Sequence, residues 1–129
     1  MPPRILVVDD EPAVTDLIEA VLVGEGYTVA IARDGAQGLM LARDWNPDLV
    51  LMDVRLPAVD GGTVIRKLKG EAATADIPII AMSAGSNIRQ QSGDLAVADG
   101  ALAKPFDIEA LLAQVAFNLA RRQPVADDA

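Results

Sequence analysis

The sequence contains neither cysteine nor histidine among its 129 residues. The absence of cysteine excludes disulfides, thiolate metal sites and thiol nucleophiles. The absence of histidine excludes Ser-His and Cys-His catalysis and the usual zinc sites. Any chemistry must therefore use carboxylates, hydroxyls, lysine, arginine or a hard metal ion.

Aromatic residues and positive charge are also scarce. One Trp, one Tyr and two Phe leave the core to Val, Ile, Leu, Ala and Met. The net charge of −8 argues against direct nucleic-acid binding, because phosphate contacts need a basic patch. No apolar run is long enough to span a membrane and the first residues lack a signal-peptide pattern. We therefore expect no membrane contact and a cytoplasmic location.

Apolar patterns of strand type and helix type alternate along the chain. Short aliphatic runs predict strands at 4–9, 27–32, 48–53, 77–82 and 101–104. Helical periodicity predicts helices at 12–24, 36–45, 64–69, 88–96 and from 107 onward. This alternation with short connections predicts an α/β fold, a doubly wound parallel sheet covered on both faces. The length suits one domain, at 1–123, followed by a polar tail at 124–129.

Polar side chains gather where the predicted strands end. They are Asp9 and Asp10 after the first strand, Asp53 at the end of the third, Ser83 after the fourth and Lys104 at the end of the fifth. In an open parallel sheet these positions share one edge, where ligands bind. Adjacent acids repel one another, so the pair "DD" needs a cation. Carboxylates suit Mg²⁺, and a carboxylate nucleophile with a lysine and a hydroxyl suits phosphoryl transfer.

Four of these five residues also have a simpler interpretation, and Asp53 is the exception. Asp10 can cap a helix that begins at Pro12, and Asp9 can merely end a strand. Ser83 alone is a loop hydroxyl, and Lys104 alone is a solvated charge. The pair Asp60-Gly61 is better explained as a turn and helix start than as a ligand. The convergence of the five side chains on one edge carries the functional hypothesis.

Four short motifs give the sequence a resemblance to a known family. They are "VVDDEP", "LMDVRLPAVDG" around Asp53, "AMSAG" with Ser83 and "AKPF" with Lys104. In this order and on these elements they resemble the receiver domain of two-component response regulators, in particular the single-domain chemotaxis regulators. The resemblance covers nearly the whole chain. It implies a flavodoxin-like five-stranded sheet in the order 2-1-3-4-5.

The resemblance also implies roles for the matching residues. Asp53 would accept a phosphoryl group, and Asp9, Asp10, Asp53 and the backbone carbonyl of Arg55 would hold Mg²⁺, Asp9 partly through water. Ser83 would bind the phosphoryl group, Lys104 would ion-pair with it, and Lys104-Pro105 would be a cis peptide. The donor would be a histidine on a partner kinase or histidine phosphotransfer protein, in keeping with a chain that has no histidine.

Two positions depart from the family pattern. Ala101 stands where the family has Tyr or Phe three residues before the lysine, so this position has no aromatic ring to bury. Arg55, two residues after Asp53, could shield the phosphorylated aspartate or pair with an acid. Ser83, Ala101 and Pro105 are the expected switch and output positions. The expected output face comprises the helix at 88–96, the strand at 101–104 and the helix from 107, including Leu95, Val97, Ala101 and Leu102.

The leading hypothesis is a phosphorylation-dependent signalling switch that is not a turnover enzyme, with slow autophosphorylation from small donors and slow autodephosphorylation. A phosphate-independent adaptor is the alternative that Ala101 favours. An aspartate-nucleophile phosphatase ranks last, because such enzymes want an aspartate where this chain has Arg55. We expect a monomer or weak homodimer with a downstream protein partner. The sequence leaves open whether it is a whole protein or one domain of a longer regulator.

Overall fold

The computed structural model describes residues 2–56, 60–84 and 98–121. The strands are β1 (Arg4–Val8), β2 (Thr28–Ala32), β3 (Leu49–Asp53), β4 (Ile79–Ala84) and β5 (Gly100–Lys104). The helices are α1 (Pro12–Gly24), α2 (Gly35–Asp44), α3 (Gly61–Gly70) and α6 (Ile108–Arg121). The helix predicted at 88–96 and the predicted tail lie outside the described residues.

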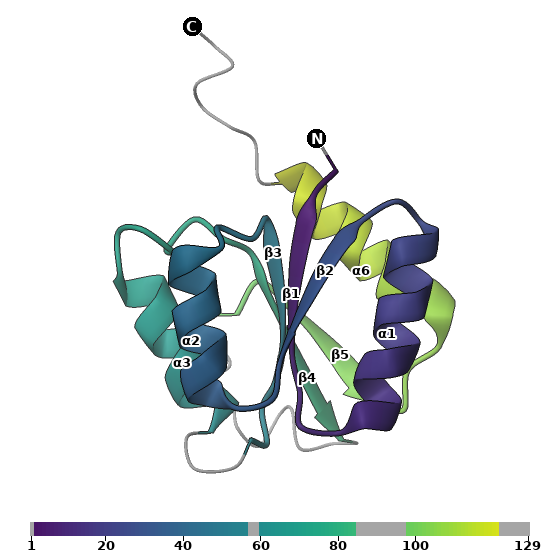
Figure 1. The fold of residues 1–129 in the computed structure, drawn as a ribbon, viewed down its shortest axis with the longest axis horizontal. Helices are drawn as coiled ribbons and strands as arrows, with labels where there is room; N and C mark the ends of the chain where they lie inside the picture. Colours follow the sequence, from purple (N-terminus) through teal and green to yellow (C-terminus); the bar gives the residue numbers. More distant parts are fainter. Residues whose placement is uncertain (1, 57–59, 85–97, 122–129) are drawn as a thin grey trace, which may run out of the picture.

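The five strands form one parallel sheet in the order β2-β1-β3-β4-β5 (Figure 1). Helices α2 and α3 cover one face of this sheet, and α1 and α6 cover the other (Figure 1). The predicted fold class and strand order are therefore confirmed. No helix in the described part of the chain has both the length and the apolar character needed to cross a membrane.

Alternate residues of the central strands face the two helix layers, which produces two apolar cores. In β1, Leu6 and Val8 pack toward α2 and α3, whereas Ile5 and Val7 pack toward α1 and α6. All five residues of β3 are buried, as expected for a strand covered on both sides. This double burial explains why the strands read as continuous apolar runs in the sequence.

Of the two helix caps predicted from the sequence, the structure confirms the one at α3 and not the one at α1. Asp60 caps α3 by accepting a hydrogen bond from the Thr63 N–H at 3.0 Å, as its interpretation as a helix start requires. The predicted capping of α1 by Asp10 is wrong. Glu11 occupies the cap position with no side-chain bond, and Asp9 Oδ1 accepts the Glu11 N–H instead. Asp10 is thereby left free to face the edge of the sheet.

The fourth strand begins two residues later than predicted. It starts at Ile79, directly after Pro78, because proline has no N–H to donate to a neighbouring strand. It also runs to Ala84, so Ser83 lies inside the strand rather than after it. The pairing of Ala84 with Lys104 then brings the ends of β4 and β5 level at the edge where the polar residues gather.

Candidate functional site

An acid cluster forms where β1 and β3 end side by side. The register pairs Val8 with Met52, so Asp9 and Asp53 emerge next to each other at the carboxyl edge. Carboxylate oxygens of Asp9, Asp10 and Asp53 all lie within 4.8 Å of one another. Asp9 is fully buried and Asp53 is only 5% exposed, whereas Asp10 is exposed. Such a cluster requires positive charge, because like charges in a desolvated place repel strongly.

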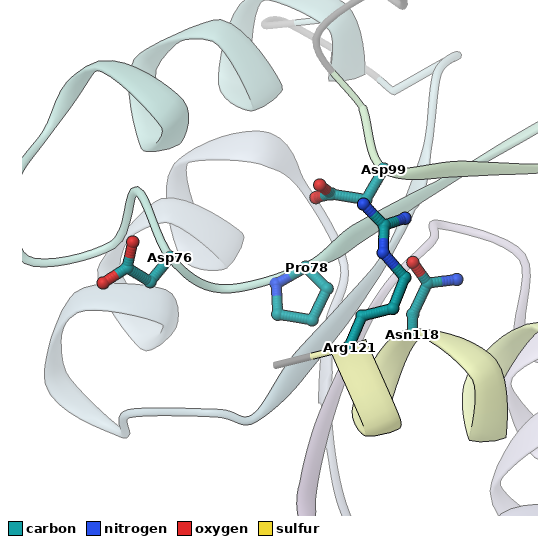
Figure 2. Close-up of a pocket in the computed structure, with 5 residues that line it drawn as sticks. All are labelled: Asp76, Pro78, Asp99, Asn118 and Arg121. Atoms are coloured by element: carbon teal, nitrogen blue, oxygen red, sulfur yellow. The ribbon is translucent and has the colours of Figure 1, made fainter. Parts of the chain in front are cut away.

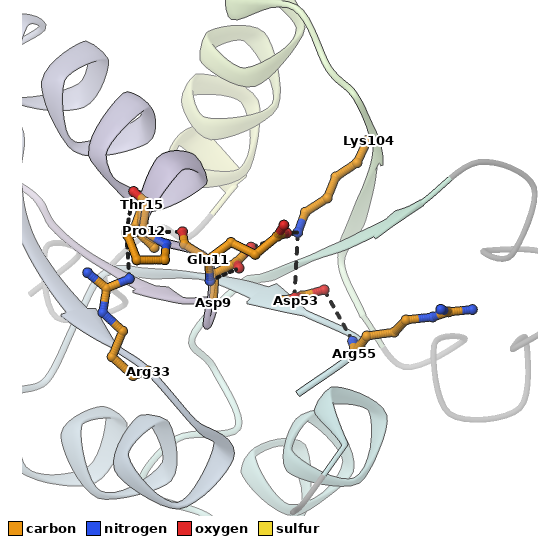
Figure 3. A network of polar contacts seen from close by, with 8 residues as sticks. All are labelled: Asp9, Glu11, Pro12, Thr15, Arg33, Asp53, Arg55 and Lys104. Atoms are coloured by element: carbon orange, nitrogen blue, oxygen red, sulfur yellow. Dashed lines mark hydrogen bonds and ion pairs between the residues drawn. The ribbon is translucent and has the colours of Figure 1, made fainter. Parts of the chain in front are cut away.

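Lys104 supplies positive charge from the end of β5 (Figure 3). Its Nζ lies 2.7 Å from Asp9 Oδ2, 3.5 Å from Asp53 Oδ2 and 3.5 Å from Glu11 Oε1. Burial alone would lower the pKa of Lys104. The hydrogen bond to Asp9 and the charges of the neighbouring acids outweigh burial and raise that pKa above its ordinary value, so Lys104 stays protonated.

Asp53 is held at the carboxyl end of β3 by its own backbone turn. The Arg55 N–H donates to Asp53 Oδ1 at 3.1 Å, and the Arg55 side chain extends away from the acids (Figure 3). Burial raises the pKa of Asp53, assisted by the charge of Asp9 and opposed by the Arg55 N–H and Lys104. Lys104 and the Arg55 N–H thus favour the ionised form of the Asp53 carboxyl, whereas burial favours its protonated form.

Ser83 lies in β4, between the strand that carries Asp53 and the strand that carries Lys104. Its backbone pairs with Ala103, and the preceding residue, Met82, pairs with Asp53. The side chain is buried, and its hydroxyl oxygen has no hydrogen-bond partner in the part of the chain that the structure describes. A buried hydroxyl in this state has its hydrogen-bonding capacity free for a ligand.

The acid cluster fits a hard divalent cation by the chemistry of its donors. Its three side chains offer only carboxylate oxygens, the ligand type that Mg²⁺ takes in proteins. Exposed Asp10 leaves one side of the cluster open to water, and Mg²⁺ usually keeps several water ligands. The residues present are therefore suitable for this ion.

A second group of polar residues, which no sequence motif indicates, lies around the start of α1 (Figure 3). Arg33 Nη1 donates to Thr15 Oγ1 at 2.7 Å, and Thr15 Oγ1 donates to the Pro12 carbonyl at 3.2 Å. Glu11 adds its contact with Lys104. Thr15 is the one of these with a sequence signal, because it is a polar residue at a buried position of an amphipathic helix.

A separate small cavity of about 90 Å³ lies at the opposite edge of the sheet (Figure 2). It is lined by Asp76, Pro78, Asp99, Asn118 and Arg121. Asn118 is buried, and its Nδ2 donates to the Gln114 carbonyl at 2.9 Å. Its Oδ1 has no partner among the described residues and is turned toward Asp99 and Arg121 (Figure 2).

The described residues include two positions of the expected output face, Ala101 and Leu102. Ala101 is exposed on β5. Leu102 is buried in the core beside Leu111 and Val115, so its assignment to the surface is wrong. The alternation of side chains along a strand turns Leu102 inward when Ala101 points outward. Leu95 and Val97 lie outside the described residues. The Lys104-Pro105 peptide is cis, as the resemblance implied.

The doubly wound parallel sheet, with an acid cluster and a lysine at its carboxyl edge, is the arrangement that the resemblance to receiver domains implied. Residues 5–116 match the family profile described as the response regulator receiver domain. The chain is also 42% identical over 120 residues to the DNA-binding dual master transcriptional regulator RpaA of Synechocystis. That match covers 92% of this chain and 50% of RpaA. The chain belongs to the response regulator receiver family.

Solved structures of similar fold agree with this assignment. A putative response regulator from Chloroflexus aurantiacus is 33% identical with a TM-score of 0.86, over 93% of this chain and 99% of that one. The receiver domain of the sensor histidine kinase PA1611 from Pseudomonas aeruginosa, described with a magnesium ion in its active-site cleft, is 32% identical. Its TM-score is 0.84, over 93% of this chain and 99% of that one. This chain spans about half the length of the curated relatives it matches.

Proposed function

We propose that this protein is a phosphorylation switch in which Asp53 accepts a phosphoryl group from a histidine on a partner protein. The observation that carries the proposal is the buried Asp53 carboxylate, 3.5 Å from Lys104 Nζ and beside Asp9 and Asp10. In the transfer, an Asp53 carboxylate oxygen attacks phosphorus and the bond from phosphorus to the donor nitrogen breaks. The electron pair of the broken phosphorus–nitrogen bond stays on the imidazole nitrogen, and an acyl phosphate forms on Asp53.

Each neighbouring residue has a proposed part in this reaction. Asp9, Asp10, Asp53 and the Arg55 carbonyl would hold Mg²⁺, which when bound supplies charge neutralisation for the phosphoryl oxygens. Lys104 would pair with one phosphoryl oxygen, and the Ser83 hydroxyl would donate to another. These parts need little covalent chemistry from the protein, because catalysis of phosphoryl transfer rests mainly on positioning and charge.

The proposed output is a change of partner binding on the face made by β5 and α6, together with the segment at 88–96. A phosphoryl group adds a charge of roughly −1.5 to −2 and three acceptor oxygens, enough to change the position of Ser83 and Lys104. Ala101 offers no ring to bury, so the signal would be transmitted by the backbone of β4 and β5 around Ser83 and Pro105.

The proposed function implies a phosphoryl donor and an output partner. The donor would be a histidine kinase or a histidine phosphotransfer protein. Curated relatives are DNA-binding regulators of about twice this length, so an output through an attached DNA-binding domain is a further proposal. The sequence-based expectation of no nucleic-acid contact then concerns the receiver domain alone and stays a prediction, as do the cytoplasmic location and the oligomeric state.

The first test is intact-mass spectrometry after incubation with Mg²⁺ and acetyl phosphate. We expect one added phosphoryl group on the wild type and on Asp44→Asn, an exposed control, and none on Asp53→Asn. Omission of Mg²⁺ should abolish the addition. Labelling of Asp53→Asn equal to that of the wild type would exclude Asp53 as the acceptor. No labelling of the wild type would favour the phosphate-independent adaptor.

A further inference from the structure

The first residue of α3, Gly61, lies against the backbone that carries Asp53. A Cβ atom built on Gly61 would lie 2.0 Å from the Asp53 carbonyl oxygen, 2.9 Å from its carbonyl carbon and 2.8 Å from Val54 Cα. All three distances are below 3.0 Å, closer than Cβ atoms approach non-bonded atoms in proteins. Gly61 does not have a positive φ, since Gly26 is the glycine with that conformation in the described residues. The position therefore needs glycine for space and not for backbone freedom.

The atoms that Gly61 contacts cannot give way in the manner of a side chain. At Gly38 the nearest atoms are Val8 side-chain methyls at 2.9 Å, and at Gly100 the nearest atom is the tip of Gln114 at 2.7 Å. Side chains can change rotamer, whereas the atoms nearest Gly61 are backbone atoms of Asp53, the last residue of the fully buried strand β3, and of Val54, the residue after it. An added methyl group at Gly61 must displace the end of β3, the start of α3, or both.

This contact fixes the turn that leaves Asp53. The Val54 carbonyl accepts the Gly61 N–H at 3.1 Å, and the Val54 N–H donates to the Met82 carbonyl at 2.9 Å. Val54 is therefore held between α3 on one side and β4 on the other. The next residue, Arg55, donates its N–H to Asp53 Oδ1 and carries the carbonyl proposed for the metal. The turn positions both the acceptor carboxylate and this carbonyl.

We propose that Gly61 is a positioning residue for the phosphoacceptor site, acting through the backbone of residues 53–55. The role in phosphorylation rests on the function proposed above. Close approach at Gly61 sets where Asp53 Oδ1 and the Arg55 backbone lie relative to Asp9 and Asp10. Gly61 makes no contact with a substrate and takes no part in the chemistry itself.

The direct test is Gly61→Ala, compared with two control variants on the same helix. Gly70→Ala places a methyl group where nothing lies within 4 Å. Val64→Ala removes buried methyl groups and so lowers stability without adding an atom near Asp53. Urea unfolding measures how far each variant is destabilised. The Val64→Ala protein then shows what loss of stability alone does to the site.

Two functional measurements separate positioning from stability. We expect Gly61→Ala to weaken Mg²⁺ binding in calorimetry about tenfold or more and to slow phosphorylation at saturating acetyl phosphate by a similar factor, since displacement of reacting groups by about 1 Å can cost up to about 100-fold. Val64→Ala and Gly70→Ala should keep wild-type values in both. Wild-type values for Gly61→Ala would overturn the proposal.

A third measurement needs neither metal nor phosphoryl donor. In the metal-free protein, the backbone amide resonances of Val54 and Arg55 should shift in Gly61→Ala and stay in place in Val64→Ala. Unchanged Arg55 resonances would overturn the proposal even if the wild type proved to bind no Mg²⁺. Shifted resonances, with no Mg²⁺ binding or phosphorylation by the wild type, would support the placement of the turn and refute the proposed function instead.

Asp60→Ala provides a second route if Gly61→Ala does not fold. Asp60 holds the first turn of α3 through the Thr63 N–H at 3.0 Å and the Thr63 hydroxyl at 3.1 Å. Its loss loosens the start of α3 without adding an atom. We then expect the Arg55 amide to exchange faster with solvent and Mg²⁺ binding to weaken severalfold. A folded Asp60→Ala with both properties unchanged would overturn the proposal.

Discussion

Replacing Lys104 by methionine should destabilise the metal-free protein, because Asp9 would keep its charge in a place that water does not reach. Asp9 is 0% exposed, and its Oδ2 accepts from Lys104 Nζ at 2.7 Å. Removing one partner of a buried ion pair typically costs about 3–5 kcal/mol. Lys104 itself keeps some contact with solvent, so we expect the lower end, about 3 kcal/mol in the free energy of unfolding.

The assay is urea unfolding at neutral pH with a chelator present, so that no divalent cation replaces the lost charge. Lys67→Met, at an exposed position of α3, is the matched control and should change the free energy of unfolding by less than about 0.5 kcal/mol. In an Asp9→Asn background, the Lys104→Met substitution should cost far less, because the buried charge is already gone.

Two results would refute this reasoning. A loss of less than about 1 kcal/mol for Lys104→Met would mean that Asp9 is hydrated in solution, at odds with its full burial. An equal loss in the presence and absence of Asp9 would mean that Lys104 acts through packing of its methylene groups and not through this ion pair. Restored stability on adding Mg²⁺ would agree with charge as the cause.

Three further predictions concern other residues. Burial raises the pKa of Asp53 above its unfolded value, so the native state binds more protons and the free energy of unfolding should fall as the pH rises between the two pKa values. Asp53→Asn should remove this part of the pH dependence and raise the midpoint of thermal unfolding at neutral pH. Asn118→Leu should stabilise the protein by about 1 kcal/mol in urea unfolding, because it removes a buried oxygen that has no partner among the described residues; a clear loss would show that the oxygen has a partner. Arg33→Ala should cost about 1 kcal/mol through its bond to Thr15, and no change in urea unfolding would make that bond a surface contact without energetic weight.

The sequence predicted the architecture well because its signals are local. Aliphatic runs of strand length, helical periodicity and the turn residues between them identify each element without knowledge of its neighbours. The convergence of Asp53 and Lys104 on one edge followed from a general property of parallel sheets. The strand order came from family resemblance, because nothing local specifies which strands pair.

The features that sequence reasoning missed depend on contacts between distant elements. Asn118 reads as an ordinary polar residue of α6 until its burial is known. Glu11 contacts a lysine 93 positions away. The inward direction of Leu102 is not predictable from the resemblance that placed it on the surface, because it depends on which face of the sheet the neighbouring helix covers. The space requirement at Gly61 arises from the approach of α3 to β3, and a single "DG" dipeptide predicts only a turn.

Lys104 links the edge strand β5 to the central strands β1 and β3 through its ion pairs with Asp9 and Asp53. The acids come from β1 and β3, adjacent strands in the interior, whereas the cation is carried by β5, the last strand of the sheet. Its ammonium group is already engaged with Asp9 at 2.7 Å, so moving it toward a new group on Asp53 means loosening that first bond or shifting β5. A phosphoryl group on Asp53 would therefore compete with Asp9 for the ammonium group of Lys104. A partner that displaces β5 should therefore change the affinity of the acids on β1 and β3 for a cation. By linkage, cation binding should change the affinity for that partner by the same factor.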